Sequence, residues 1–326
     1  MKLSVVVPVY GVEKYIARCA KSLLEQTYAD KEIVFVDDAS PDRSVEILKQ
    51  VLDDYPHVQT RILSHAVNLG LAATRKTGLD AATGEYIVSV DSDDYLELNA
   101  LELLAQKARE TKAEVIALDC WFEWNNRRKV YCGDFSANMY EYSRILLSGA
   151  ALPNMWRHMI RRDLYIRTGL YPIEGLNNGE DYVLTPPLCW YAQSVAKMET
   201  PLYHYCQMNN GSITHNVSES GIRQLTQALE QLSVFYADKP DCARALQAGQ
   251  WLKKVDMFMR ADKQAYALVD HMPGSLPPVV DTMTLFQRIA AHMAARKSWN
   301  LLWIYSRCYA GLLETIQILK GRRRGC

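Results

Sequence analysis

Short, continuously apolar segments alternate with segments of helical periodicity in the N-terminal part of the chain. Residues 3–10 and 32–36 are largely apolar, with no alternation of polar and apolar positions, and Pro8 lies near the end of the first of these runs. Strands that are buried on both faces, as in the middle of a parallel sheet, have this composition. Residues 15–26 and 41–55 carry apolar side chains at spacings of three and four, which predicts two helices. Ser40 and Pro41 are typical of the N-cap and first position of the second helix.

The same alternation continues through the next forty or so residues. A short strand is predicted at 60–63, a helix at 71–82, and a buried strand at 85–90 that follows Gly84. Four strand and helix repeats in this order predict the α/β class, with a Rossmann-like, doubly wound and mostly parallel sheet flanked by helices. Ligands of such sheets bind at the carboxyl ends of the strands.

The pattern changes in the rest of the chain. Helices are predicted at 97–109 and 182–191, a helix start near 160–164, a strand that enters a polar loop over 118–130, and a strand at 195–202. Beyond residue 219 the periodicity is helical throughout, at 219–237, 241–259, 282–297 and 299–320. We therefore predict an α/β domain over residues 1–215 and a helical C-terminal extension over 216–326.

The end of the extension combines an amphipathic helix with a basic tail. One face of this helix is formed by Leu302, Tyr305, Tyr309, Leu312, Ile316 and Leu319. Residues 320–324 contain four basic side chains. An aromatic, amphipathic helix beside basic residues predicts peripheral contact of 299–326 with an anionic membrane. A helix packed on its own domain, with a frayed basic end, remains the alternative.

Composition excludes several classes of protein. The 326 residues include 37 basic and 37 acidic side chains, so the net charge gives no reason to expect nucleic-acid binding. Eight scattered cysteines lack the Cys-x-x-Cys spacing of zinc or redox sites, and they fit reduced thiols. No signal peptide and no apolar run of membrane-spanning length are found. We expect a cytoplasmic protein, at most peripheral on the inner face of the cell membrane.

An acidic cluster, Asp91-Ser92-Asp93-Asp94, follows the buried strand at 85–90. Neighbouring carboxylates repel one another, and a hard cation such as Mg²⁺, Mn²⁺ or Ca²⁺ relieves that repulsion. A solvated turn that caps the next helix is the simpler alternative. A calcium loop does not fit, because Tyr95 and Leu96 occupy positions that need a ligand and a glycine. A dehalogenase-type phosphatase would have a small, glycine-containing turn there.

Other strand ends carry side chains that are suited to ligand binding. Tyr10 ends the first strand, and Asp37 and Asp38 end the second. Their convergence with the acidic cluster on one edge of the sheet predicts a nucleotide cleft. Neither Gly-x-Gly-x-x-Gly nor Gly-x-x-x-x-Gly-Lys is present, which excludes a dinucleotide-binding Rossmann site and a P-loop.

Four motifs together resemble glycosyltransferase family 2. These are Pro8-Val9-Tyr10, Asp37-Asp38-Ala39-Ser40, Asn68-Leu69-Gly70 through Arg75, and Gly84-Glu85-Tyr86 to Asp91-Ser92-Asp93-Asp94. The resemblance covers residues 1–215 and implies an inverting enzyme of the GT-A fold, with a donor half over 1–95 and an acceptor half over 96–215. A phosphorelay receiver domain also has paired aspartates, but its pair follows the first strand.

The resemblance implies roles for individual residues. Those expected to bind the nucleotide-sugar are Pro8, Tyr10, Asp38, Arg75, Asp91 and Ser92. Tyr10 can stack on a base, and Asp38 can accept a hydrogen bond from an imide N–H. Asp93 is the implied ligand of Mn²⁺ or Mg²⁺, with Asp91 and Asp94 as further candidates. Where the family often has asparagine, this chain has Gly11 and Lys76.

A second pair of acids, Glu180-Asp181, begins the helix predicted at 182–191. First-turn acids stabilise a helix dipole, and this role needs no catalysis. The resemblance implies instead that Asp181 is the catalytic base. Candidates for an acceptor or lid position are Trp156, Glu180, His204, Gly211 and Ser212.

The function implied is metal-assisted, inverting sugar transfer by direct displacement. The expected donor is a nucleotide-diphosphate sugar, with UDP as the nucleotide, and the expected acceptor is a glycan or a lipid-linked glycan of a bacterial surface polysaccharide. A non-catalytic relative that binds nucleotide-sugars and a metal-dependent hydrolase of phosphate groups are the two alternatives.

Overall fold

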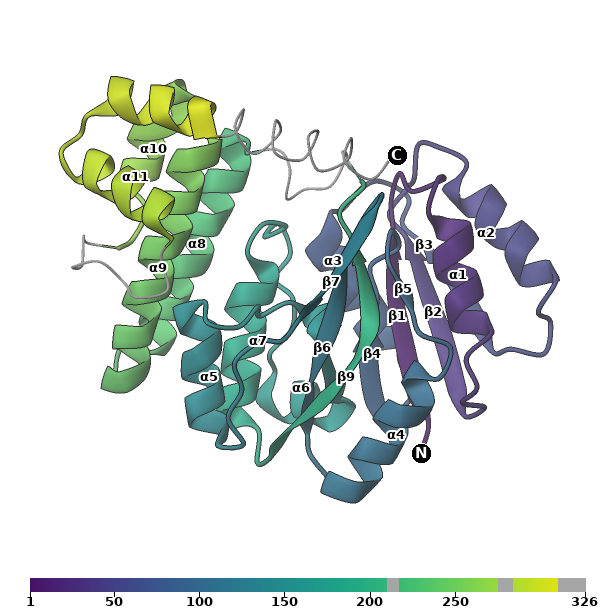
Figure 1. Cartoon of the computed structure of the whole chain (residues 1–326). Coiled ribbons are helices and arrows are strands. Elements are labelled where there is room, and N and C mark those ends of the chain that lie inside the picture. Colours follow the sequence, from purple (N-terminus) through teal and green to yellow (C-terminus); the bar gives the residue numbers. More distant parts are fainter. Residues whose placement is uncertain (210–216, 275–283, 310–326) are drawn as a thin grey trace, which may run out of the picture. The chain divides into compact units, whose positions relative to one another are not determined.

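The computed structural model describes residues 1–209, 217–274 and 284–309. The chain divides into two compact units, one formed by Met1–Leu146 with Ala151–Asn210 and the other by Leu147–Ala150 with Gly211–Cys326. The first unit is an α/β structure with helices on both faces of one sheet (Figure 1). The second unit is helical.

The first half of the sheet is parallel, as predicted. Its strands are β1 (Leu3–Val9), β2 (Lys31–Asp37), β3 (Thr60–Ser64) and β4 (Tyr86–Ser89), which lie in the order β3-β2-β1-β4. Every residue of β1, β2 and β4 is buried, because helices cover both faces of these strands. Val9 is in register with Asp37, so the carboxyl ends of β1 and β2 lie side by side.

The second half makes the sheet mixed. β8 (His158–Arg161) is antiparallel to both β4 and β6 (Val115–Trp124). β9 (Val195–Cys206) is parallel to β6, and β5 (Tyr95–Leu96) pairs with β9 in the antiparallel sense. The sequence did not predict β8, and the helix expected near 160 begins only at α6 (Arg162–Thr168). A four-residue strand is too short for its apolar pattern to be distinguished from a helix start.

Two layers of helices cover the two faces of the sheet. One apolar core includes α1 (Ile16–Leu24), α2 (Ser44–Asp53) and α4 (Ala100–Thr111). The other includes α3 (Leu71–Ala81), α5 (Met139–Ser148), α6 and α7 (Glu180–Tyr191). The prediction that α2 begins at Pro41 was wrong. The Asp42 carboxylate accepts from the backbone N–H of Ser44, and this turn delays the helix to Ser44.

Residues 118–130 form a β-hairpin instead of a strand and an irregular loop. Asn125 and Asn126 make a two-residue turn between β6 and β7 (Arg127–Tyr131). Cross-strand pairs run from Trp124 and Arg127 next to the turn to Cys120 and Tyr131. Asparagine favours turns because its side chain can hydrogen-bond to the nearby backbone, so the Asn125-Asn126 pair is a local signal for this turn.

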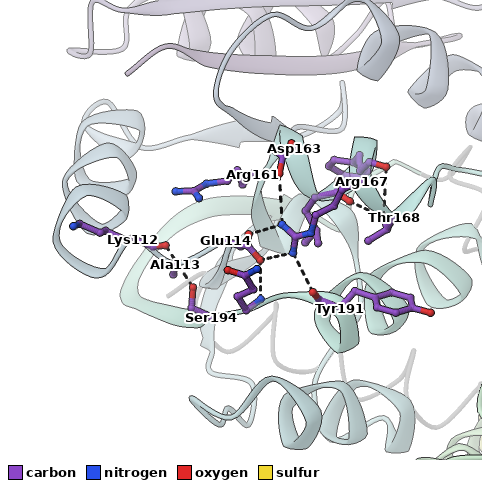
Figure 2. A network of polar contacts seen from close by, with 12 residues as sticks. Lys112, Ala113, Glu114, Arg161, Asp163, Arg167, Thr168, Tyr191 and Ser194 are labelled. Atoms are coloured by element: carbon purple, nitrogen blue, oxygen red, sulfur yellow. Dashed lines mark hydrogen bonds and ion pairs between the residues drawn. The ribbon is translucent and has the colours of Figure 1, made fainter.

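A buried carboxylate ties the second half of the sheet to its helices (Figure 2). Both oxygens of Glu114 accept from the Arg167 guanidinium of α6, at 2.5 and 2.7 Å. The same guanidinium donates to the backbone oxygen of Tyr191 at 3.1 Å, at the end of α7. Burial would raise the pKa of Glu114, but the hydrogen bonds from Arg167 and the Gln193 backbone lower it. The network therefore fixes α6 and the end of α7 against the start of β6.

The described part of the second unit is a set of helices around α9. It comprises α8 (Glu219–Phe235), α9 (Pro240–Arg260), α10 (Tyr266–Asp270), α11 (Leu285–Ala295) and a helical segment at 299–309. Phe258 stacks on Trp299 with ring centroids 5.4 Å apart, and Tyr266 packs edge-on against Phe258. The basic tail and half of the residues of the amphipathic face predicted for 299–320 lie outside the described residues. Among the helices that are described, none has the length and apolarity that crossing a membrane requires.

Candidate active site

The acidic cluster forms a tight turn after β4. The backbone N–H of Asp94 donates to the backbone oxygen of Asp91 at 3.0 Å. The Asp94 carboxylate is fully buried and accepts from the Cys206 backbone N–H at 2.7 Å and from the Tyr203 hydroxyl at 2.6 Å. The Tyr203 hydroxyl in turn accepts from the backbone N–H of Asp91. Asp94 thus anchors the turn to β9, and its carboxylate is already engaged within the protein.

Asp91 and Asp93 are the carboxylates of this turn that remain suited to a ligand. The Asp91 side chain is 26% exposed. Asp93 accepts from the Asn209 amide at 2.9 Å, and Arg18 donates to its backbone oxygen at 2.8 Å. Burial raises the pKa of Asp93, and the charge of Asp91 raises it further. Burial, together with the charges of Asp93 and Asp91, also raises the pKa of Asp94.

Carboxylates packed this closely repel one another, so the turn is short of positive charge. A divalent cation would supply it, and carboxylate oxygens are the ligands that Mg²⁺ and Mn²⁺ prefer. In the described ranges, no three His, Cys, Asp or Glu side chains are arranged to hold a metal ion by themselves. Such an ion usually takes one or two carboxylates and completes its shell with water and substrate phosphates. The donor set at Asp91 and Asp93 fits that mode of binding.

Arg75 joins the acidic turn to the second pair of acids. From α3, its guanidinium donates to Asp91 at 2.8 Å, to Glu180 at 2.6 Å and to Asp181 at 2.8 Å. Arg75 is only 2% exposed. Burial would lower its pKa, but the three carboxylates raise it, so the guanidinium stays charged. Two sites that are ninety residues apart in the sequence therefore form one cluster.

Asp181 lies in the first turn of α7, after Gly179 in the left-handed conformation. Its second carboxylate oxygen accepts from the Asn154 amide at 3.3 Å. Burial raises the pKa of both Asp181 and Glu180, whereas the charge of Arg75 lowers it. Arg75 and Asn154 hold the Asp181 carboxylate from two sides, which is the arrangement a positioned general base requires.

The predicted nucleotide-binding residues differ in how far their side chains are exposed to a ligand. Tyr10 is 50% exposed and free to stack on a planar ring. Asp38 is buried, and its carboxylate accepts from His65 and from the backbone N–H groups of Leu69 and Gly70. In this arrangement Asp38 holds the loop before α3. Pro8 and Ser92 are buried at the same sheet edge.

Two of the acceptor or lid candidates belong to the core. Trp156 is 2% exposed and stacks on Tyr203 at 4.5 Å, so it supports the residue that holds Asp94. His204 is buried between Glu123 and Glu97 and stacks on Tyr95. Neither ring presents a surface to a ligand here, which differs from the prediction. Gly211 and Ser212 lie outside the described residues.

Sequence reasoning missed four side chains that shape the site. They are Arg18, Asn154, Tyr203 and Asn209. None of the four lies in one of the sequence motifs. Each donates a hydrogen bond to a carboxylate or a backbone carbonyl of a residue that is far away in the sequence. Tyr203 follows the predicted strand at 195–202, but its partner Asp94 could be found only from the pairing of β5 with β9.

Comparison with known proteins identifies the class of protein. Residues 4–159 match the model of glycosyl transferase family 2. YibD of Escherichia coli, an uncharacterized glycosyltransferase, is 30% identical over 257 residues, which cover 73% of each chain. The chain belongs to glycosyl transferase family 2.

Two further proteins are similar over different shares of their length. EpsJ of Bacillus subtilis, also an uncharacterized glycosyltransferase, is 32% identical over 65% of this chain, and the chain spans 62% of EpsJ. The structure of residues 1–349 of S. aureus TarS in complex with UDP-GlcNAc aligns with a TM-score of 0.63 at 19% identity, covering 95% of this chain and 92% of that one. The likeness to TarS shows a shared fold.

Proposed function

We propose that this protein is an inverting glycosyltransferase that moves a sugar from a nucleotide-diphosphate donor to a glycan. The observation that carries the proposal is the Arg75 cluster, which holds Asp181, a base candidate, within one ion network with Asp91 of the acidic turn. In a direct displacement, the leaving diphosphate and the attacking hydroxyl lie on opposite sides of one anomeric carbon. The carboxylates that would hold the ion at the diphosphate and the base that would take the hydroxyl proton must therefore lie close together, as Asp91 and Asp181 do in this network. The family to which the chain belongs supports the same reaction class.

UDP is the proposed nucleotide. Tyr10 offers an exposed ring at the edge where β1 and β2 end, and a base can stack on it. Asp38 adjoins this position, and its Oδ2, which accepts only from Gly70, keeps one lone pair for an imide N–H, although its first role is to hold the loop of Leu69 and Gly70. The TarS structure of the same fold contains UDP-GlcNAc, and this supports a UDP-sugar for the present chain.

Asp93 and Asp91 would hold Mn²⁺ or Mg²⁺, with the donor diphosphate as the remaining partner. When bound, the ion neutralises the charge that develops on the leaving diphosphate. The protein contributes the rigidity of the turn. Asp94, Tyr203 and Asn209 fix its backbone and the Asp93 carboxylate through hydrogen bonds.

Asp181 is the proposed base of the transfer step. The acceptor hydroxyl attacks the anomeric carbon while the bond from that carbon to the diphosphate oxygen breaks. The hydroxyl proton passes to the Asp181 carboxylate, which needs to lie within about 3 Å of it. A single displacement inverts the anomeric centre. The raised pKa of Asp181 makes its carboxylate a better proton acceptor, and the ion pair with Arg75 keeps it ionised.

A growing or lipid-linked glycan of a surface polysaccharide is the proposed acceptor. The support is the similarity to EpsJ and YibD, both named as glycosyltransferases. Peripheral contact of 299–326 with an anionic membrane is part of the same proposal, and it rests on the basic tail of the sequence.

Two matched substitutions test the proposal. Asp181→Asn should retain metal-dependent binding of UDP-GlcNAc in calorimetry but reduce sugar transfer by about 10²–10⁴-fold, because the proton acceptor is lost. Asp93→Asn should instead weaken UDP-GlcNAc binding and its dependence on Mn²⁺. Asp53→Asn, at an exposed position of α2, is the control and should change neither property.

The outcomes of these assays on the variants and the wild type separate the alternative functions. Full transfer by Asp181→Asn would rule out Asp181 as the base. Binding of UDP-GlcNAc without any transfer in the wild type, across a panel of glycan acceptors, would favour a non-catalytic relative. Release of free sugar or phosphate in place of a glycoside would favour the hydrolase.

A further inference from the structure

The tip of the β6–β7 hairpin extends past its neighbouring strands. β9 pairs with β6 only as far as Glu123, and β8 only as far as Ala117. Beyond Glu123 lie only the Trp124–Arg127 pair and the turn at Asn125 and Asn126. In the described residues β7 pairs with β6 alone, so the hairpin forms an edge of the sheet. The side chains of this ribbon, residues 121–130, are therefore open to a partner at the turn and along β7.

The ribbon carries three consecutive exposed cations, Arg127, Arg128 and Lys129. In the part of the chain that the structure describes, no ion pair joins any of the three to a carboxylate. Glu123 lies directly opposite Arg128 but is engaged by Tyr95 at 2.7 Å and by His204 at 2.9 Å. The positive charge of the tip is therefore available to an anionic partner.

Aromatic rings accompany these cations on both faces of the ribbon. The Arg127 guanidinium lies 4.3 Å from the Trp124 ring, and that of Arg128 lies 4.5 Å from the Trp121 ring. Trp121 and Trp124 are an odd number of residues apart in one strand, so they point to opposite faces. Each face thus has one partly exposed tryptophan with one arginine over it.

This two-sided distribution indicates the kind of partner. A glycan would be bound by one face or by a concave site. A membrane interface surrounds an element that enters it, so it meets both faces, and tryptophan and arginine are the side chains favoured at that depth. Anionic headgroups match the three cations in charge. We propose that the β6–β7 hairpin docks on an anionic membrane surface.

The base of the hairpin is fixed to the candidate active site. Trp121, His204 and Tyr95 stack in sequence, with Tyr95 and His204 only 4.1 Å apart. Arg18 covers the far side of Tyr95 at 4.5 Å and donates to the backbone oxygen of Asp93. A docked hairpin would therefore hold the acidic turn at a set height above the headgroups, where a lipid-linked acceptor would be presented. This proposal goes beyond the transfer reaction, because docking needs no donor.

Sedimentation with vesicles tests the proposal on the full chain. The probes are vesicles of phosphatidylcholine with 30% phosphatidylglycerol, and vesicles of phosphatidylcholine without it. Each basic side chain near an anionic surface strengthens binding about fivefold, so Arg127→Gln with Arg128→Gln should weaken binding to the anionic vesicles by about 30-fold. Trp124→Ala should weaken it as well. The control pair is Lys21→Gln with Lys49→Gln, at exposed positions of α1 and α2. It removes the same charge and should change binding to the anionic vesicles only slightly.

Each outcome has a defined meaning. Equal weakening by the hairpin and control pairs would overturn the proposal, because net charge alone would then explain binding. Unchanged binding of the hairpin pair to the anionic vesicles would also overturn it. So would a result in which the hairpin substitutions abolish binding to a soluble acidic polysaccharide and leave binding to vesicles unchanged. Calorimetry with UDP-GlcNAc on the same variants keeps the two proposals apart. The hairpin pair should retain donor binding, and loss of donor binding would point to misfolding of the acidic turn.

Discussion

At the scale of single residues, Glu32 is the buried carboxylate that holds the edge of the sheet away from the candidate site. It accepts from the Ser4 hydroxyl at 2.6 Å, from the Thr83 backbone N–H at 2.6 Å and from Lys2 at 3.0 Å. Arg61 adds an ion pair at 3.3 Å. One side chain thus connects β1, β2 and β3 with the segment that leads into β4.

Glu32→Gln should therefore destabilise the protein strongly without touching the candidate site. Removing one partner of a buried ion pair costs about 3–5 kcal/mol of the free energy of unfolding, because the other charges lose their compensation. Urea unfolding at pH 7 measures this loss. Glu46→Gln, at an exposed position of α2, is the control and should leave the free energy of unfolding unchanged within error.

The effect of Glu32→Gln should also depend on pH. Burial would raise the pKa of Glu32, but hydrogen bonds from Ser4, Thr83 and Lys2 lower it to about 2. In the unfolded chain a glutamate titrates near about 4.3. The carboxylate therefore contributes its stability above that pH and loses it as the pH falls towards 2. The gap between wild type and variant should narrow below about pH 4, and a constant gap from pH 7 to pH 3 would contradict this account.

Sequence patterns predicted some residues of the candidate site and gave no sign of the contacts that connect them. Asp91, Asp93 and Asp181 could be predicted as site residues because each lies in a sequence motif at the end of a strand or the start of a helix. The connection of Asp91 with Glu180 and Asp181 through Arg75 could not be predicted, since three hydrogen bonds from one guanidinium depend on how α3 packs beside α7. The burial of Trp156 likewise follows from its stacking on β9 and has no local signal.

At the scale of elements, α3 receives its N-terminal cap from a distant loop. Gly70 is the N-cap residue and has no side chain to bond the first turn. The Asn177 amide oxygen accepts instead from the Ala72 backbone N–H at 3.0 Å. Asn177 precedes the Glu180-Asp181 pair, and Arg75 lies one turn into α3. The cap therefore aligns the two elements whose charged side chains meet in the site.

Gly70→Ala should damage this alignment. Gly70 has φ +91° and ψ 166°, a conformation that is essentially restricted to glycine. A Cβ atom there would also lie 2.2 Å from the Asn177 side chain. We expect the free energy of unfolding to fall by about 2–4 kcal/mol from strain and loss of the cap, with lower transfer activity. Urea unfolding and a transfer assay measure the two effects.

Gly169→Ala provides the matched control. Gly169 also has a positive φ angle, +66°, but nothing lies within 4 Å of a Cβ built there. Its substitution should cost only about 1–2 kcal/mol for the left-handed backbone and leave transfer intact. Equal losses of stability and activity in the two variants would mean that the contact with Asn177 has no special role.

Elements were predicted well where several signals agreed. The strands β1, β2 and β4 are short runs rich in β-branched residues, and α1 has clear helical spacing, so pattern and structure coincide. β8 and the β6–β7 hairpin were missed for a physical reason. A four-residue strand and a polar ribbon are stabilised by their pairing with other strands, and pairing partners leave little trace in a local pattern.

At the scale of the whole molecule, the two compact units have separate cores. The cores of the first unit lie on the two faces of its sheet, whereas that of the second is built around α9. All described residues of the candidate site belong to the first unit. A donor that binds there can stabilise the second unit only if the two unfold together. Differential scanning calorimetry can therefore measure how far the units are coupled.

We expect two unfolding transitions, because each unit buries its own apolar core. UDP with Mn²⁺ should raise the midpoint of one transition, by about 2.7 kcal/mol of stability at a hundredfold excess over Kd, and leave the other in place. Val255→Ala, at a fully buried position of α9, should lower only the transition that UDP does not move. Asp93→Asn should abolish the shift with UDP. A single transition that UDP and Val255→Ala both move would show instead that the chain unfolds as one cooperative structure.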